Sequence, residues 1–154
     1  MTTANTTAIR TADPRMGQVR QALWIGLALQ LALAALPLLD LATLDTITAH
    51  VRTAYPDWSA GDVALDRNAI TWSLVGLGVL GAVGWLIALL RARRGAPRVT
   101  ATVLFTLGLV TSLTLLGTGG ENYDQIVPLG YGLLGLLPVL AGLAALVSVW
   151  RTAR

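Results

Sequence analysis

The sequence predicts an all-α protein: a four-helix transmembrane bundle with a short extracytoplasmic helix-turn-helix loop between the first and second spans. Of its 154 residues, 55% are hydrophobic and 12% are charged, a balance outside the range of ordinary soluble domains. The apolar residues form four uncharged runs, each close to the ~20 residues that a helix needs to cross a bilayer. These runs cover residues 22–39, 70–90, 99–117 and 129–150.

The first run has two interpretations. A polar segment, residues 1–21, precedes it, and Ala32-Leu33-Ala34 has the small residues of a signal-peptide cleavage site. However, its 18 apolar residues exceed the ~7–15 of a typical signal peptide. We therefore favour an uncleaved span after a cytoplasmic tail, with residues 22–154 as one membrane domain. Either Met1 or Met16 can serve as the start.

The loop between the first two spans, residues 40–69, has a helical pattern of its own. Ile47, Val51 and Tyr55 recur at four-residue intervals and form one apolar face. Asp45 is the expected N-cap of this helix. Pro56 follows it and is expected to end it.

A second helix is expected to start in the same loop and to continue into the membrane. Ser59 is followed three residues later by Asp62, which is a variant of the capping box. In the spans themselves, Pro37 and Pro138 are expected to cause kinks that neighbouring helices tolerate.

The arginines indicate the orientation. Nine of the eleven lie in the tail, in the link between the second and third spans, or at the C-terminus; Arg52 and Arg67 lie in the first loop. The positive-inside rule therefore places both termini in the cytoplasm, with the protein in the cell membrane. Seven of the eight acidic residues lie in the opposite loops. The basic charge thus reflects topology, and we expect no nucleic-acid binding.

All basic residues are arginine and none is lysine. Together with the abundance of alanine, leucine and glycine, this composition suggests a bacterium with a high-GC genome, such as an actinobacterium. In its overall plan the chain resembles the uncharacterised small four-span integral membrane proteins of actinobacteria. The resemblance rests on topology and composition alone, so it implies no functional residues.

Residues 76–81, GLGVLG, match the G-x-G-x-x-G spacing of a dinucleotide-binding loop. That motif has meaning between a strand and a helix, with an acidic residue about 20 positions later. Here it lies within a span, and no acidic residue occurs between Asp66 and Glu121. We instead predict a helix-packing groove, because small residues let helices approach closely in lipid. Its members are Gly78, Gly81, Ala82, Gly84 and Ala88, with a matching seam at Ala141, Ala145 and Ser148 on the fourth span.

Few polar side chains lie in the spans. Gln30 is the only amide in a span core, and Thr111 and Thr114 belong to a threonine face of the third span. These three residues are candidates for the polar lining of a transport pathway. We favour the simpler interpretation, in which they hydrogen-bond to helix carbonyls or to a neighbouring helix.

The residue inventory argues against catalysis. There is no cysteine, the single histidine, His50, lies in a loop, and no acidic residue lies inside a span. These facts argue against thiol relay chemistry, bis-histidine haem binding and coupling through an embedded acid. His50 with Asp45, Asp57 and Asp62 has no recognised metal-ligand spacing. We predict no catalytic residue, cofactor or metal.

The predicted function is that of a non-catalytic accessory, regulatory or scaffold subunit. Its partners would be the lipid bilayer and other membrane proteins or a second copy. The alternative is a small oligomeric transporter or channel, and a weaker one is a sensor that acts through the outer loop. Arg52, Tyr55 and Trp58 are the candidates for partner contact. For Tyr55 and Trp58, anchoring at headgroup depth is slightly favoured.

The predicted orientation can be tested with reporter fusions. We expect a reporter that is active only outside the cytoplasm to be inactive after residue 154 and active after residue 60, since translocation leaves the arginine-rich side inside. The opposite pattern at either position would rule out this topology.

Overall fold

The computed structural model describes residues 14–93 and 97–151, which form helices and loops with no strand in these ranges. The elements are α1 (Pro14–Ala42), α2 (Thr46–Ala54), α3 (Ala60–Arg93), α4 (Pro97–Gly117), α5 (Leu129–Leu134) and α6 (Leu136–Arg151). Four segments are long and apolar enough to cross a membrane: Gly17–Ala42, Ala60–Ala92, Arg98–Gly117 and Leu129–Arg151. The prediction of an all-α bundle with four spans is therefore confirmed.

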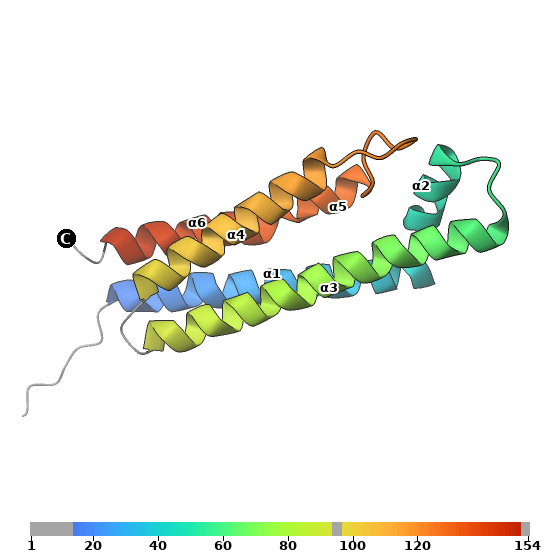
Figure 1. Cartoon of the computed structure of the whole chain (residues 1–154). Coiled ribbons are helices and arrows are strands. Elements are labelled where there is room, and N and C mark those ends of the chain that lie inside the picture. The colour runs from blue at the N-terminus through green and yellow to red at the C-terminus, as the bar shows by residue number, and fades with distance from the viewer. Residues whose placement is uncertain (1–13, 94–96, 152–154) are drawn as a thin grey trace, which may run out of the picture.

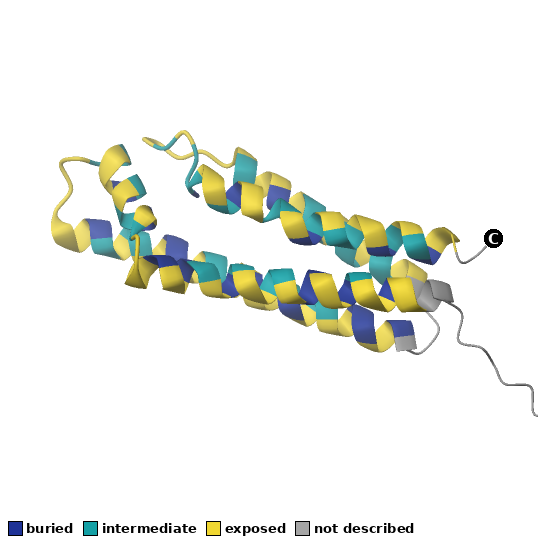
Figure 2. Cartoon of the chain, turned by 180° about the vertical axis from the view of Figure 1, so that it is seen from behind, coloured by how far each residue is buried: buried dark blue, intermediate teal, exposed yellow. Residues whose placement is uncertain are grey.

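The spans form two layers that diverge towards one end (Figure 1). One layer contains α1 and α3, and the other contains α4 with α5 and α6. α1 packs along both α3 and α6, whereas α3 and α4 make less extensive contact. α2 lies at the wide end, while α1 begins and α6 ends at the narrow end. Exposed residues run along the outside of every span (Figure 2), as expected for helices that face lipid.

α1 begins at Pro14, inside the segment predicted as a polar tail. Proline suits the first turn of a helix because its missing N–H would have no partner there. Val19, Leu23 and Leu27 recur every four residues and are all buried in the main apolar core. Burial of this face lets the helix begin at Pro14, before the uncharged run that starts at residue 22. Residues 1–13 lie outside the described residues.

The helix-turn-helix prediction is confirmed, including the start of α3. The hydroxyl of Ser59 accepts a hydrogen bond from the backbone N–H of Asp62 (3.2 Å) and donates one to the Asp62 carboxylate (2.6 Å). α3 has 34 residues, or about 51 Å of helix, which exceeds the ~30 Å hydrocarbon core. One end of α3 must therefore project beyond the hydrocarbon.

Asp45 occupies the N-cap position of α2, as predicted, but its side chain does not cap the helix. Asp45 adopts a left-handed conformation with φ of 50° and makes no side-chain cap hydrogen bond. Asp40, at the end of α1, instead accepts hydrogen bonds from the backbone N–H groups of Thr46 and Ile47, both at 3.2 Å. The Thr46 hydroxyl donates to the same carboxylate at 2.7 Å. The left-handed turn at Asp45 brings the start of α2 back over α1, where Asp40 satisfies its free donors.

The fourth span is divided at Gly135 into α5 and α6. Pro138 causes this division, because it has no N–H for the carbonyl of Leu134 and its ring crowds the preceding turn. The Ser112 hydroxyl of α4 donates to the Gly135 carbonyl at 3.2 Å. A neighbouring span thus supplies a hydrogen-bond donor beside the interrupted helix. Such donors are what allow proline within membrane-spanning helices.

Glycines bring α1 and α3 into close contact. A Cβ atom built on Gly78 would lie 2.6 Å from the Cα of Ala34, and one on Gly81 would lie 2.5 Å from the amide of Gln30. On α1, Gly26 lies beneath the indole ring of Trp85. The packing groove predicted from the sequence therefore faces α1 at these positions. Gly84 faces Leu104 of α4, and Ala82 and Ala88 belong to the main core.

We expect Gly78→Leu to lower the melting temperature in detergent by roughly 5 °C or more, because the side chain would force the α1 and α3 backbones apart. Gly76→Leu is the matched control, since a Cβ on Gly76 meets no atom within 4 Å. It should melt within about 2 °C of the wild type. Equal melting of the two variants would contradict a close contact between α1 and α3.

Candidate functional site

The wide end of the bundle carries an assembly that we call the outer cap, made of α2, residues 55–68 and the loop at residues 118–128. Two long-range hydrogen bonds join its parts. The Tyr123 hydroxyl donates to the Asp66 carboxylate at 2.5 Å, and His50 Nε2 lies 2.9 Å from the Gln125 carbonyl. Because a carbonyl only accepts, His50 carries its proton on Nε2. The loop is thus tied to both α2 and α3.

Aromatic rings fill the inside of the outer cap. Tyr55 stacks on Trp58 with ring centroids 3.8 Å apart, and it meets Tyr123 edge-on at 5.2 Å. The His50 ring also stacks on the Tyr123 ring, with the two ring centroids 5.1 Å apart. Below them, Ile47 and Val51 are fully buried against α3. Both offset-stacked and edge-on arrangements are favourable for aromatic pairs.

The three predicted partner-contact residues occupy different positions in the outer cap. Arg52 is exposed on α2, and Trp58 is 38% exposed beside its stacking partner. Tyr55 is half-buried between Trp58 and Tyr123. The structure therefore leaves Arg52 and one part of Trp58 accessible, while Tyr55 packs within the cap.

A cavity of about 390 Å³ lies between the spans. On α3 its wall runs from Leu74 to Ala88 and on α4 from Ala101 to Leu115. α1 contributes Gln30, and the fourth span contributes residues on both sides of the Gly135 break. Volumes of about 300–1,000 Å³ are typical of small-molecule sites.

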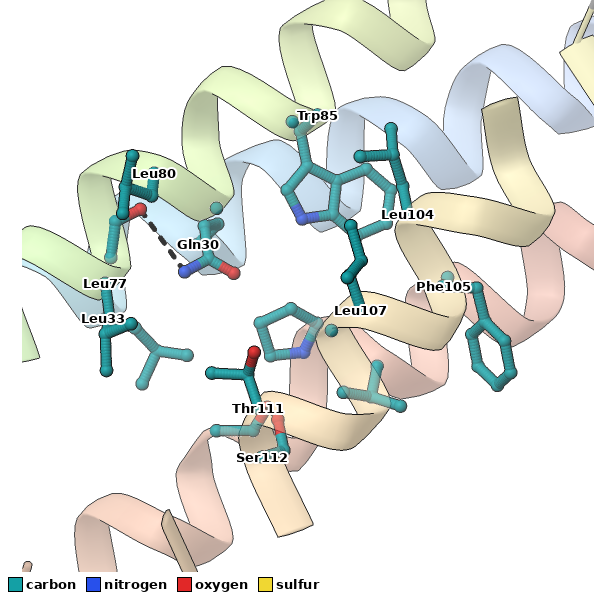
Figure 3. A pocket seen from close by; sticks show the side chains of 18 of the residues that line it. Gln30, Leu33, Leu77, Leu80, Trp85, Leu104, Phe105, Leu107, Thr111 and Ser112 are labelled. Atoms are coloured by element: carbon teal, nitrogen blue, oxygen red, sulfur yellow. Dashed lines mark hydrogen bonds between the residues drawn. The ribbon is translucent and has the colours of Figure 1, made fainter. Parts of the chain in front are cut away.

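Two predicted polar residues share this cavity. Gln30 of α1 and Thr111 of α4 both line it and approach it from different sides (Figure 3). The Gln30 side-chain N–H donates to the Gly78 carbonyl at 3.3 Å, so its amide also joins α1 to α3. Thr114, the third candidate, is exposed and does not line the cavity. Thr102 and Thr118 hydrogen-bond to carbonyls four residues earlier.

Several contact residues were not predicted from the sequence. In the sequence, Asp40 is only one of the seven acidic residues outside the arginine-rich side. In the structure it is 93% buried and its carboxylate caps the start of α2. Tyr131 lines the cavity and lies close to Asp40 and Thr46. The pairing of Tyr123 with Asp66 joins residues 57 positions apart. An acid just after an apolar run was the one available signal, and it could have identified Asp40 as a cap.

The described residues contain no cluster of three or more His, Cys, Asp or Glu side chains that could hold a metal. No family model, curated protein or solved structure matches the chain. The class of the protein therefore follows from its architecture: it is a multi-pass helical membrane protein with four spans.

Tyr123 is the titratable residue of the outer cap whose surroundings change its ionisation most clearly. Burial raises the pKa of its phenol well above the ordinary value, and the hydrogen bond to Asp66 and the negative charge of that carboxylate raise it further. The folded protein therefore holds this proton more tightly than the unfolded chain does. The resulting contribution to stability is complete below about pH 10 and declines as the pH rises above that value.

We expect the melting temperature of the wild type to fall as the pH rises from 10 to 11, and Tyr123→Phe to reduce that fall. Tyr55→Phe leaves the bond between Tyr123 and Asp66 in place, so it should retain the wild-type pH dependence. Thermal melts followed by circular dichroism would measure both effects. Identical slopes for wild type and Tyr123→Phe would contradict the effect assigned to Asp66.

Proposed function

We propose that this protein is a non-catalytic accessory, regulatory or scaffold subunit that contacts other membrane or envelope proteins through its outer cap. The observation that supports this most directly is the internal bonding of the cap. Two hydrogen bonds and two aromatic contacts of Tyr123 tie the 118–128 loop to residues 50–66, and the stack of Tyr55 on Trp58 adds to them. A surface ordered in advance loses less conformational freedom on binding.

The exposed residue types also favour a binding surface. Arg52 and Trp58 belong to the types enriched at binding hot spots, and both are accessible on the ordered cap. The competing role of Trp58 and Tyr55 is to anchor the cap at headgroup depth, where amphipathic rings are favoured. The stacked pair is compatible with either role, so an experiment must separate them.

Orientation and source form part of this proposal. Both ends of the described chain lie at the narrow end of the bundle (Figure 1), which supports a common side of the membrane for them. The arginine distribution favours the cytoplasmic side for them and the outside for the cap. The exclusive use of arginine favours a bacterial, actinobacterial source.

The alternative function is that of a small oligomeric transporter or channel. It is favoured by one observation, namely that Gln30 and Thr111 line the same cavity between the spans. A pathway for solutes requires polar groups at such a place. Reconstituted vesicles distinguish the two proposals: solute flux above that of protein-free vesicles, lost in Thr111→Val, would favour transport.

The accessory role can be tested with Arg52→Ala combined with Trp58→Ala. If the cap binds a partner, we expect at least a tenfold loss of chemically cross-linked protein in tagged purifications, with unchanged yield and melting temperature. Thr53→Ala, an exposed neighbour on α2, is the control and should keep the partner. A lower yield with an unchanged set of cross-linked proteins would instead indicate a membrane anchor.

A further inference from the structure

The cavity between the spans is long and narrow. Its walls extend along α3 from Leu74 to Ala88 and along α4 from Ala101 to Leu115, fourteen helical steps in each case. This corresponds to about 21 Å of helix, or two-thirds of the ~30 Å hydrocarbon core. A volume of about 390 Å³ along that length is suited to one extended chain.

The cavity opens towards lipid. Leu77, Leu80 and Leu107 line it, yet they are 36%, 69% and 58% exposed on the surface of the bundle. They belong to α3 and α4, the adjacent spans that pack least closely. All three lie within membrane-spanning segments, so the opening faces hydrocarbon. A ligand must therefore arrive from the bilayer.

The outer end of the cavity is covered. Tyr131 lines the cavity there, and its phenol lies close to Asp40 of α1 and Thr46 of α2. These contacts connect the fourth span to the outer cap. The lateral opening between α3 and α4 is therefore the favoured route by which a ligand enters the cavity.

Two polar atoms in the cavity have unused hydrogen-bonding capacity. The Gln30 N–H is bonded to the Gly78 carbonyl, but its Oε1 faces the space bounded by Trp85 and Thr111 (Figure 3). Among the described residues, neither Gln30 Oε1 nor the Thr111 hydroxyl has a hydrogen-bond partner. An unpaired polar group within hydrocarbon is unfavourable, so both atoms favour a ligand that supplies a partner.

We propose that the cavity binds a long-chain alcohol, that is, a single hydrocarbon chain that carries one uncharged hydroxyl group. The chain lies along the leucine walls between α3 and α4. A hydroxyl group matches both polar atoms, because it donates to an amide oxygen and accepts from a threonine hydroxyl. A charged headgroup does not fit, because no charged side chain lines the cavity and a charge at this depth is costly.

Trp85 provides a direct measurement, because its ring lies in the cavity (Figure 3). A protein with Trp85 as its sole tryptophan, the other four being replaced by phenylalanine, is titrated in detergent with dibromo-octadecanol. Bromine quenches indole fluorescence at contact, so we expect saturable quenching. Dibromo-octadecane, which lacks the hydroxyl, should bind roughly three- to tenfold more weakly. A protein with only Trp72, which is 64% exposed, should show quenching that does not saturate.

Two glycines allow a matched blocking experiment. A Cβ on Gly108 or on Gly76 meets no atom within 4 Å, but only Gly108 lines the cavity. Gly108→Phe should therefore abolish saturable quenching, while Gly76→Phe should keep it, both with wild-type circular dichroism. Thr111→Val should weaken the alcohol roughly three- to tenfold and leave the hydrocarbon unchanged.

Three results would overturn the proposal. The first is non-saturable quenching of Trp85, equal to that of Trp72. The second is equal binding of alcohol and hydrocarbon, which would mean that the polar atoms are satisfied by water. The third is complete displacement of the alcohol by phosphatidylcholine, which would assign the cavity to the acyl chain of a membrane lipid. None of these measurements depends on the outer cap or its partner.

Discussion

The close approach of α1 and α3 is the contact on which the rest of the structure depends. Lipid provides no hydrophobic drive for association of apolar helices, so they must gain contact by bringing their backbones together. Gly78 against Ala34 and Gly26 beneath Trp85 provide this contact from both helices. Because α1 also packs along α6, it holds the two layers together and leaves α3 and α4 free to diverge. The cavity lies where they diverge.

Divergence of the layers leaves an open wedge at the wide end, and the outer cap closes it. α2 lies across this end (Figure 1) and is held there by Asp40 below and by His50 and Tyr123 on the loop side. Asp40 is a buried carboxylate, but the backbone N–H groups at the start of α2 and the Thr46 hydroxyl compensate its charge. This polar network and the buried apolar face of α2 together close the wide end.

Tyr131 of α5 connects the cavity to the outer cap. Tyr131 lines the cavity and lies close to Asp40 and Thr46, so the outer wall of the cavity is near the start of α2. An occupant of the cavity that moved Tyr131 would act on the residues that position α2. A change at the cavity wall and a change at the start of α2 can therefore be coupled through Tyr131.

Composition and periodicity were sufficient to predict the four spans, the short helix at Thr46–Ala54 and the capping box at Ser59, because these depend on local sequence and on the bilayer. They also singled out Gln30 and Thr111 as polar residues in apolar spans. They did not predict that Asp40 would cap α2, since that requires the chain to turn back at Asp45. Nor did they predict the pairing of Tyr123 with Asp66 or the meeting of Gln30 and Thr111 at one cavity. Only tertiary structure decides which distant residues meet, because glycine contacts and a proline break set the distances and angles between helices.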